Sequence, residues 1–384
     1  MSNDTQPEIR FPGFTDDWEQ RKLGDFVVDY VEKTSVQNQF PMLTSSQQKG
    51  IVLQEDYFAN RQVTTENNIG YFVLPRGYFT FRSRSDNDVF VFNRNDIIDR
   101  GIISYFYPVF TLKSADSDFF LRRINNGIQR QLSIQAEGTG QHVLSLKKFK
   151  NIVAMFPSEE EQQKIGTFFK QLDDTIALHQ RKLDLLKETK KGFLQKMFPE
   201  NGAKVPEIRF PGFTEDWEER KLGDITKIST GKLDANAMVE NGKYDFYTSG
   251  IKKYRIDVAA FEGPSITIAG NGATVGYMHL ADNKFNAYQR TYVLQEFLVD
   301  RSFIFSEIGN KLPKKIKQEA RTGNIPYIVM DMLTELKLSI PQNNSEQQKI
   351  GSFFKQLDDT IALHQRKLDL LKETKKGFLQ KMFV

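Results

Sequence analysis

The feature that most constrains this 384-residue chain is a long segment that occurs twice. Residues 161–198 and 346–383 are identical except that Thr167 in the first copy corresponds to Ser352 in the second. Within each copy, apolar or long side chains recur at alternating steps of four and three residues, which predicts one apolar face on a continuous helix. Each helix would be about 57 Å long at a rise of about 1.5 Å per residue. Two nearly identical apolar faces in one chain most simply pack against each other.

We expect the packing face of this helix pair to include the histidine that each copy carries at the same repeat position, in a structural role. The predicted packing residues are Ile165, Phe169, Leu172, Ile176, His179, Leu183 and Leu186 in the first copy, and Ile350, Phe354, Leu357, Ile361, His364, Leu368 and Leu371 in the second. A serine lies three residues before a Glu or Gln at the start of each helix. Ser158 and Ser345 are therefore the predicted helix caps.

A second, shorter repeat precedes each helix by more than 100 residues. Residues 7–25 and 206–224 differ at two positions, both conservatively. In the first copy, Thr15 is followed by two acidic residues, and Gly24 comes shortly after, so this segment predicts a short helix. The single tryptophan of each copy predicts that the motif docks against a neighbouring element.

The chain is therefore built as motif, variable region and long helix, with the same order repeated. The two variable regions, about 26–160 and 225–345, are not detectably alike in sequence. Each contains strand-like pieces rich in Phe, Tyr, Val and Ile together with helical stretches, which predicts an α+β domain with its own core. Such an arrangement places two different domains on one repeated frame.

The predicted helix pair is antiparallel, because the second variable region begins where the first helix ends and stops where the second helix begins. If the helices were parallel, one compact domain would have to bridge about 57 Å. We therefore expect an antiparallel coiled coil with pseudo-twofold symmetry and one globular domain at each end. The predicted boundaries are 1–157 for the first domain with its motif, 158–198 for the first helix, 199–205 for a linker, 206–344 for the second domain with its motif, and 345–384 for the second helix.

Composition and charge constrain the cellular compartment and the possible partners of the protein. The net charge of +4 comes from the two repeated helices, while the rest of the chain is nearly balanced, so bulk charge is only a weak indication of nucleic-acid binding. Cysteine is absent, which excludes disulfides and thiolate metal sites and fits a reducing cytoplasm. The first residues lack the pattern of a secretion signal, and no apolar run reaches the roughly 18 residues of a membrane span. We expect a cytoplasmic protein without a membrane partner.

Catalytic motifs are mostly missing from the sequence. The histidines have no metal-binding spacing, and no complete phosphate-binding loop is present. Residues Asn324 to Tyr327 resemble the Asn-Pro-Pro-Tyr motif of adenine-N6 methyltransferases but lack its second-position proline. The glycine-rich segment from Gly270 to Gly276 lies between two strand-like pieces, which predicts a turn that could let the backbone approach a DNA duplex. We predict no catalytic residue and no metal site.

Basic residues form clusters inside both variable regions despite their balanced totals. Each cluster alone is also typical of a solvated surface, but several in each of two dissimilar domains suit phosphate contacts, with nearby Asn, Gln and Arg available for base edges. The candidate DNA-binding residues are Arg82, Arg84, Arg122, Arg123, Arg130, Lys147, Lys148, Lys252, Lys253, Arg255, Asn271, Lys314, Lys315, Lys317 and Arg321.

Over its whole length the chain resembles the specificity subunit of type I restriction-modification systems. The resemblance rests on the repeated order of motif, variable domain and long helix. It also rests on EQQKIGTFFKQLDDTIALHQRKLDLLK and its copy, and on PEIRFPGFTDDWEQRKLGD and its counterpart PEIRFPGFTEDWEERKLGD.

This resemblance implies a non-catalytic subunit that recognises double-stranded DNA. Each variable region would be a target recognition domain that reads one half of an asymmetric, bipartite site, and the helices would set the gap between the halves. Two modification subunits would bring S-adenosylmethionine and methylate adenine N6. Restriction subunits would add ATP- and Mg-dependent translocation and cleavage, so that this chain itself would bind no cofactor.

Two other interpretations stay open from the sequence. The chain could be a coiled-coil scaffold or adaptor that binds no DNA, which a gel shift with a random duplex library would separate from the leading interpretation. It could also be a stand-alone DNA methyltransferase, which lack of methyl transfer by the purified chain would exclude. The recognised bases and the basic clusters that face DNA are not defined by the sequence, because base readout depends on how the protein docks.

Overall fold

The computed structural model describes residues 6–58, 67–138, 140–200, 202–319 and 326–383. The chain divides into two compact units. Unit 1 contains residues 1–179 and 367–384, and unit 2 contains residues 180–366. Each unit therefore combines one variable region with parts of both long helices.

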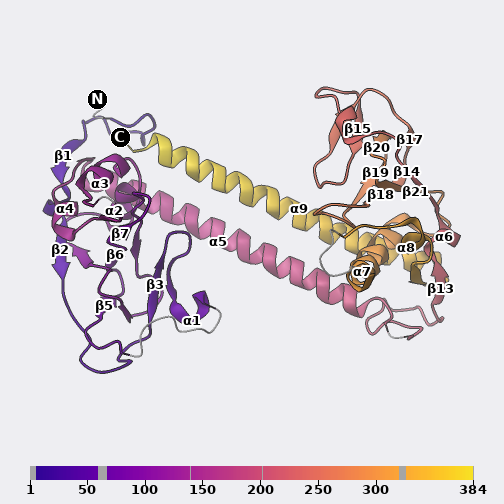
Figure 1. The fold of residues 1–384 in the computed structure, drawn as a ribbon, viewed down its shortest axis with the longest axis horizontal. Coiled ribbons are helices and arrows are strands. Elements are labelled where there is room, and N and C mark those ends of the chain that lie inside the picture. Colours follow the sequence, from indigo (N-terminus) through magenta and orange to yellow (C-terminus); the bar gives the residue numbers. More distant parts are fainter. Residues whose placement is uncertain (1–5, 59–66, 139, 201, 320–325, 384) are drawn as a thin grey trace. The chain divides into compact units, whose positions relative to one another are not determined.

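Unit 1 is built around a four-stranded antiparallel sheet with the strand order β2-β10-β6-β8, of which β2 and β6 are labelled in Figure 1. Its strands are β2 (Val27–Tyr30), β10 (Val109–Leu112), β6 (Phe79–Phe81) and β8 (Phe92–Arg94). Phenylalanines from this sheet, including Phe79, Phe81, Phe92 and Phe110, are fully buried in the core. The aromatic-rich runs predicted as strands therefore form the centre of the unit.

Shorter elements surround this sheet in unit 1. They are the hairpin of β3 (Leu43–Ser46) and β4 (Gly50–Leu53), α1 (Gln54–Tyr57), the pair of β5 (Phe72–Pro75) and β9 (Arg100–Ile103), the pair of β7 (Arg84–Ser85) and β11 (His142–Val143), and the helices α2 (Ser117–Asn125), α3 (Gln129–Gln135) and α4 (Leu146–Lys150). Helix α2 begins where the carboxylate of Asp116 accepts the backbone N–H of Phe119 at 2.8 Å, which caps the helix.

Unit 2 also contains a four-stranded antiparallel sheet, in the order β14-β21-β18-β19. Its strands are β14 (Lys227–Thr230), β21 (Thr291–Gln295), β18 (Ser265–Ala269) and β19 (Met278–Ala281). The other elements are the sheet of β16 (Tyr254–Ile256), β15 (Tyr244–Tyr247), β20 (Lys284–Ala287) and β17 (Phe261–Glu262), together with η2 (Ala235–Ala237), α7 (Arg301–Glu319) and α8 (Met330–Thr334).

The central sheets of the two units share one topology although the variable regions have no detectable sequence likeness. In each sheet the first strand along the chain pairs with the fourth, the fourth with the second, and the second with the third. A helix with an aspartate cap follows the fourth strand in both units, at Asp116 and at Asp300. Packing volume and hydrophobic pattern can be kept by different residues, so a common core need not leave a sequence signature.

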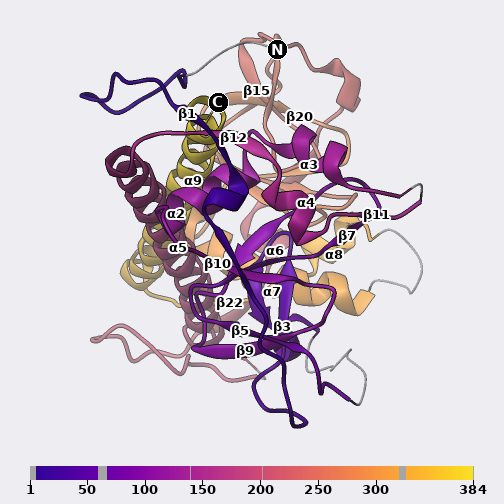
Figure 2. The same ribbon diagram turned by 90° about the vertical axis from the view of Figure 1, so that its left-hand side faces the viewer.

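The short helix predicted to start at Thr15 is wrong. The structure instead has a strand, β1 (Glu19–Lys22), which pairs with β12 (Val153–Phe156), the segment just before the first long helix (Figure 2). Pairing with a distant strand satisfies the backbone and overrides the local capping signal. The predicted docking of the tryptophans is confirmed, since Trp18 and Trp217 are buried.

The second copy of the motif has the same arrangement in unit 2. Strand β13 (Glu218–Lys221) pairs with β22 (Lys337–Ile340), which leads into the second long helix. A short helical turn follows the strand in each copy, η1 (Leu23–Asp25) and α6 (Leu222–Ile225). The repeated motif therefore pairs with the strand that leads from each variable region into its long helix.

Both predicted long helices are present, as α5 (Glu159–Lys196) and α9 (Asn344–Lys381). The predicted cap of α5 is confirmed, because the Ser158 hydroxyl accepts the backbone N–H of Glu161 at 3.4 Å. The predicted cap of α9 at Ser345 is wrong. Its own backbone N–H donates at 2.9 Å to the side chain of Asn343, which occupies the repeat position of Ser158 and starts the helix earlier.

In unit 1, the first part of α5 runs antiparallel to the last part of α9. Phe168 packs edge-to-face on Phe378 with ring centroids 5.0 Å apart. Further along α5, Asp173 pairs at 2.5 Å with Lys375, which precedes Phe378 on α9, as antiparallel helices require. The backbone N–H of Ile9 also donates to the carbonyl of Lys381 at 2.9 Å, so the N-terminal motif contacts the end of α9.

In unit 2, the last part of α5 and the first part of α9 repeat these contacts. Phe193 packs edge-to-face on Phe353 at 5.0 Å, and Lys190 donates to Asp358 at 2.5 Å. These segments also run antiparallel. Lys190 of α5 is therefore held by an ion pair to α9.

All the predicted packing residues are withdrawn from solvent to some degree. Ile165, Phe169, Leu183, Ile350, Phe354, His364 and Leu368 are buried, and Leu172, Ile176, His179, Leu186, Leu357, Ile361 and Leu371 are half-buried. Their individual partners across the pair stay predictions. Among the described residues, the helices include none with an apolar stretch long enough to cross a membrane.

Candidate nucleic-acid interfaces

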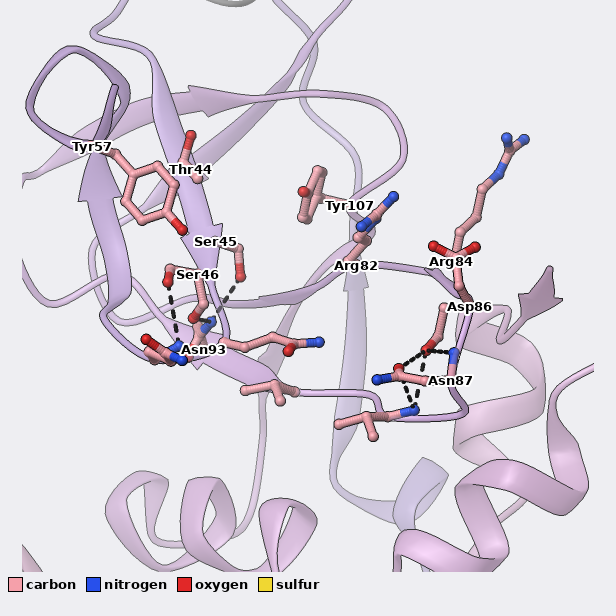
Figure 3. Close-up of a pocket in the computed structure, with 15 residues that line it drawn as sticks. Thr44, Ser45, Ser46, Tyr57, Arg82, Arg84, Asp86, Asn87, Asn93 and Tyr107 are labelled. Carbon is pink, nitrogen blue, oxygen red and sulfur yellow. Dashed lines mark hydrogen bonds between the residues drawn. The ribbon is translucent and has the colours of Figure 1, made fainter. Parts of the chain in front are cut away.

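Unit 1 has a polar concavity of about 510 Å³ on the accessory elements beside its central sheet. Figure 3 shows Thr44, Ser45 and Tyr57 on one side of it, Arg82 and Arg84 on the other, and Tyr107 between them. The lining residues are Thr44, Ser45, Ser46, Gln47, Gln48, Tyr57, Arg82, Arg84, Ser85, Asp86, Asn87, Val89, Val91, Asn93 and Tyr107.

One wall of this concavity is the β3–β4 hairpin, which is held by an amide from the central sheet. Asn93 of β8 donates through Nδ2 to the Ser45 hydroxyl at 2.8 Å and to the Ser46 carbonyl at 2.9 Å. The Ser46 hydroxyl accepts the backbone N–H of Gln48 at 3.3 Å, which shapes the turn. The turn therefore presents the exposed carboxamides of Gln47 and Gln48 on a fixed backbone.

The opposite wall is the segment after β6, from which two arginines project. The hydroxyl of Ser83, which lies between the two arginines, donates to the carbonyl of Phe106 at 2.8 Å and anchors the segment. Arg82 and Arg84 are exposed, and the Arg84 guanidinium lies 4.4 Å from the centre of the Phe106 ring. Burial raises the pKa of Tyr107, with the charge of Arg82 opposing that shift, so its phenol is neutral near pH 7.

The chemistry of this concavity suits nucleic acid more than catalysis. Guanidinium groups can contact phosphates or guanine edges, while carboxamides and hydroxyls can donate to and accept from base edges. Among the described residues, no group of three or more His, Cys, Asp or Glu side chains could hold a metal ion.

In unit 2, the glycine-rich segment forms the predicted turn between β18 and β19. Gly272 and Gly276 adopt positive φ values of 85° and 82°, which glycine tolerates without a steric penalty. Ser249, in the segment after β15, donates to Asn271 at 2.5 Å and accepts through its carbonyl from the Thr274 hydroxyl. These contacts fix the two loops side by side.

Two exposed lysines near this pair of loops lie over aromatic rings. Lys252 lies 5.4 Å from the centre of the Tyr254 ring, and Lys253 lies 5.6 Å from that of Tyr247. The His279 ring packs against Tyr247 at 5.1 Å, and burial lowers the pKa of His279, so its imidazole is neutral near pH 7. Arg255 is committed internally, since it pairs with Asp245 and donates to backbone carbonyls.

The predicted residues of the two units lie on matched loops. Arg82 and Arg84 follow the second strand of the sheet in unit 1, and Asn271 follows the second strand of the sheet in unit 2. In each unit this loop lies beside an accessory turn that is inserted between the first and second strands of the sheet. The turn is that of the β3–β4 hairpin in unit 1, and in unit 2 it is the segment that carries Lys252 and Lys253. The structure thus brings together candidates that lie in separate sequence clusters.

Other candidate residues lie elsewhere in unit 1. Arg123 is 2% exposed and donates to the carbonyls of Met155 and Asn126, and burial lowers its pKa to about 10, so it is a core residue rather than a surface cation. Arg122 pairs with Asp173 of α5. Arg130 and Lys147 are exposed, and Lys148 pairs with Glu137 at 2.6 Å.

The lysines of α7 are mostly engaged with nearby carboxylates. Lys314 pairs with Glu200 in the segment after α5, and Lys315 pairs with Glu319 at 2.5 Å, whereas Lys317 is exposed. Arg321 lies outside the described residues. These contacts make α7 a weaker candidate for DNA contact than the loops of unit 2.

The Asn-x-Pro-Tyr segment meets the glycine-rich turn. Asn324 and Ile325 lie outside the described residues. Tyr327 is 60% exposed, and the following residue, Ile328, donates its backbone N–H to the Gly270 carbonyl at 2.8 Å. The segment therefore supports the turn of a candidate interface.

The sequence did not point to the residues of the candidate interfaces that lie outside the basic clusters. They are Thr44, Ser45, Gln47, Gln48, Tyr57, Asn93 and Tyr107 in unit 1, and Ser249 and Tyr277 in unit 2. The run TSSQQK at residues 44–49 was a usable signal, because short polar side chains followed by carboxamides at a hairpin turn can reach base edges.

Comparison with known proteins adds an independent line of observation. The profile of the type I restriction modification DNA specificity domain matches residues 15–188 and 214–373. The type I restriction enzyme EcoDI specificity subunit of Escherichia coli is 32% identical over 43% of this chain and 37% of its own length. The MjaVIII specificity subunit of Methanocaldococcus jannaschii is 24% identical over 65% of each chain. The chain thus matches less than two thirds of the length of either relative.

Solved structures show the same fold. The S subunit of a type I restriction-modification system from M. genitalium superposes with a TM-score of 0.71 at 15% identity, over 99% of both chains. A chain from a structural study of complex assembly of the type I R-M system gives a TM-score of 0.50 at 16% identity, over 98% of this chain and 99% of its own.

Proposed function

This chain belongs to the family of type I restriction-modification DNA specificity subunits, the non-catalytic recognition components of these systems, and we propose that it reads a bipartite, asymmetric DNA site. The resemblance seen in the sequence is confirmed at the level of the family. In the proposed function, each unit reads one half of the site.

The observation that carries this proposal is the pair of matched interfaces. Both units place a loop after the second strand of the same central sheet beside an accessory turn. The side chains on these loops differ: Arg82 and Arg84 in unit 1, Lys252, Lys253 and Asn271 in unit 2. A common scaffold with different contact residues is what two different half-sites require, because base contacts set specificity while the scaffold sets position.

The proposed role of the long helices is to hold the two readers at a set separation. Within each unit the paired segments are antiparallel, which supports the predicted coiled coil and pseudo-twofold arrangement. Two readers on one duplex must meet grooves spaced according to the helical repeat of about 34–36 Å. A spacer built of two paired helices would therefore define the number of base pairs between the half-sites.

The proposed partners supply the chemistry. Two modification subunits with S-adenosylmethionine would flip and methylate one adenine in each half-site, because a base inside the stack is not accessible to the enzyme. Restriction subunits with ATP and Mg would translocate and cleave unmodified DNA. The assembly would act on DNA in the cytoplasm.

Methylome sequencing of cells that express this chain with its modification subunit tests the proposal. The expected result is one bipartite motif with a methylated adenine in each half. Exchange of residues 26–160 for another reader should change one half of that motif and leave the other. Loss or alteration of both halves would contradict modular reading, and a random-duplex gel shift without any binding would favour a scaffold that does not contact DNA.

A further inference from the structure

The β3–β4 hairpin of unit 1 has a tip whose backbone is held by hydrogen bonds. The tip consists of Gln47, Gln48 and Lys49, between Ser46 and Gly50, which pair across the hairpin. The Ser46 hydroxyl accepts the backbone N–H of Gln48 at 3.3 Å and that of Lys49 at 3.2 Å. Gly50 has a φ of 72°, the left-handed conformation that closes a three-residue hairpin loop. The backbone of the tip is therefore fixed without help from its own side chains.

Asn93 of β8 connects this hairpin to the central sheet. Its Nδ2 donates to the Ser45 hydroxyl at 2.8 Å and to the Ser46 carbonyl at 2.9 Å (Figure 3). A carbonyl oxygen can only accept a hydrogen bond, so the Asn93 atom beside it has to be the amide nitrogen. Both protons of that nitrogen are thus used to hold the hairpin. Asn93 therefore sets the position of the tip relative to the sheet.

The side chains of the tip that line the concavity are two carboxamides. Gln47 and Gln48 are exposed, and both belong to the lining. The Nζ of Lys49 lies 5.6 Å from the centre of the Tyr57 ring. A carboxamide presents a donor and an acceptor side by side, which matches the N6 donor and N7 acceptor of adenine in the major groove. The tip therefore has the chemistry of an adenine contact.

The charges around the concavity favour base edges over phosphates. The exposed carboxylate of Asp86 lines it together with Arg82 and Arg84, and a carboxylate would repel a phosphate but can accept from the amino group of cytosine. In unit 2 the accessory turn carries Lys252 and Lys253 instead, which suit phosphates. The accessory turns of the two units therefore have different chemistry.

We propose that the β3–β4 hairpin enters the major groove of the half-site read by unit 1, that its tip carboxamides contact an adenine there, and that Asn93 is the positioning residue of the tip. A two-stranded β-ribbon fits the major groove, which is about 12 Å wide. The hairpin is such a ribbon, with four residues in each strand. This inference rests on the function proposed above and adds the groove, the base and the contact residues for one half-site.

Competition binding by the full-length chain, assembled with its modification subunits, tests the proposal. The competing duplexes carry every single-base change in each half of the recognised site. Gln47→Glu and Gln48→Glu keep the shape of the side chain but replace the amide donor with an acceptor, which matches cytosine N4 rather than adenine. Gln131→Glu adds the same charge at an exposed position of α3 outside the concavity and is the matched control.

Preference for adenine at one position of one half-site should fall about tenfold or more in at least one tip variant, and cytosine should gain there. The other half-site should be unchanged, and Gln131→Glu should alter no base preference. Replacement of that adenine by 7-deazaadenine removes N7, which lies in the major groove. This replacement should weaken binding of the unsubstituted chain but cause no further loss in the effective tip variant.

Asn93→Ala tests the positioning role. It should reduce discrimination at the same base and leave the salt dependence of binding unchanged, because no cation is removed. Combined with the effective tip substitution, it should cost no more at this base than that substitution alone, since both act through one contact. Circular dichroism melting identifies a variant that fails to fold, and Asn93→Ser then provides a variant that keeps one donor.

Three results would overturn the inference. Folded tip variants with the original base preference would exclude the tip from base reading. A shift at a base other than adenine, or at an adenine that tolerates the 7-deaza change, would contradict adenine contact in the major groove. Additive effects of Asn93→Ala and the tip substitution would contradict the positioning role. If the unsubstituted complex selects no bipartite site, the proposed function itself fails, so the two failures are distinguishable.

Discussion

Arg10 of the N-terminal motif and Glu161 of α5 form a bidentate ion pair in which the carboxylate is completely buried. Arg10 Nε lies 2.7 Å from Glu161 Oε1, and Nη2 lies 2.8 Å from Oε2. Arg209 and Glu346 form the same pair in unit 2. The hydrogen bond to the carboxylate raises the pKa of each arginine. A buried ion pair therefore connects the short motif to the long helix, and the buried carboxylate depends on the arginine for its counter-charge.

Arg10→Met should destabilise unit 1 by about 3–5 kcal/mol, because it leaves a buried carboxylate without a counter-charge. Urea unfolding followed by Trp18 fluorescence, in a Trp217→Phe background, measures this change. Arg21→Met is the control, since the ion pairs of Arg21 are exposed and their loss should cost less than about 1 kcal/mol. Equal effects of the two substitutions would contradict a special role for the buried pair.

Arg84→Ala should weaken recognition of one half-site only. If Arg84 reads a base, discrimination at one position should fall by about 1–3 kcal/mol. Binding titrations of the assembled enzyme against single-base variants of the motif measure this loss. Arg76→Ala removes an exposed arginine that pairs with Asp99 outside the concavity, and it should leave the half-site preference unchanged.

Lys252→Ala should weaken DNA binding by unit 2, because it removes a phosphate contact. Affinity should fall about equally for all sequences, and the slope of log K against log salt concentration should decrease by about one. Titrations at several salt concentrations provide the slope. Lys227→Ala removes an exposed lysine paired with Glu296 and is the matched control. A changed base preference with an unaltered slope would instead make Lys252 a base reader.

Insertion of one heptad at the same repeat position in α5 and α9 should lengthen the gap of the recognised site. Seven residues add about 10.5 Å of helix and keep the apolar face in phase. At about 3.4 Å per base pair, the gap should grow by about three base pairs. Methylome sequencing reads the new motif directly. Altered half-sites with the original gap would contradict the spacer role.

Unit 2 should lose stability as the pH rises from about 4.5 to about 7, because of Glu307. Burial raises its pKa to about 7, against the opposing effects of Lys311, Lys314 and the Ser339 backbone. Between about pH 4.5 and 7 the unfolded chain releases this proton while the folded chain retains it. The free energy of unfolding therefore falls by at most about 3 kcal/mol over this range and is constant above it.

Urea unfolding at pH 5 and pH 8, with Trp217 as the reporter in a Trp18→Phe background, measures this decline. Glu307→Gln should remove most of it, since the amide does not ionise. An equally large pH dependence in Glu307→Gln would place its origin in another group.

The candidate interfaces could be predicted only in part. Arg82 and Arg84 stood out because two cations alternate within an aromatic strand, and they do reach one concavity. Arg123 also belongs to a predicted basic cluster but is a core residue, because packing of α2 turns it inward. A side chain at a given helical position faces the core or solvent according to the tertiary contacts of that helix.

The sequence by itself determined the two long helices and most strands, because helix faces and buried strands depend on local spacing. It also determined the repeats and the family, because the repeated segments can be read directly from the chain. Only the tertiary structure decided that Thr15 leads into a paired strand, that Asn343 caps α9, and that Ser249 meets Asn271. It also decided that two unlike regions share one central sheet. These features depend on pairing and packing between residues far apart along the chain, and such contacts leave no local periodicity to read.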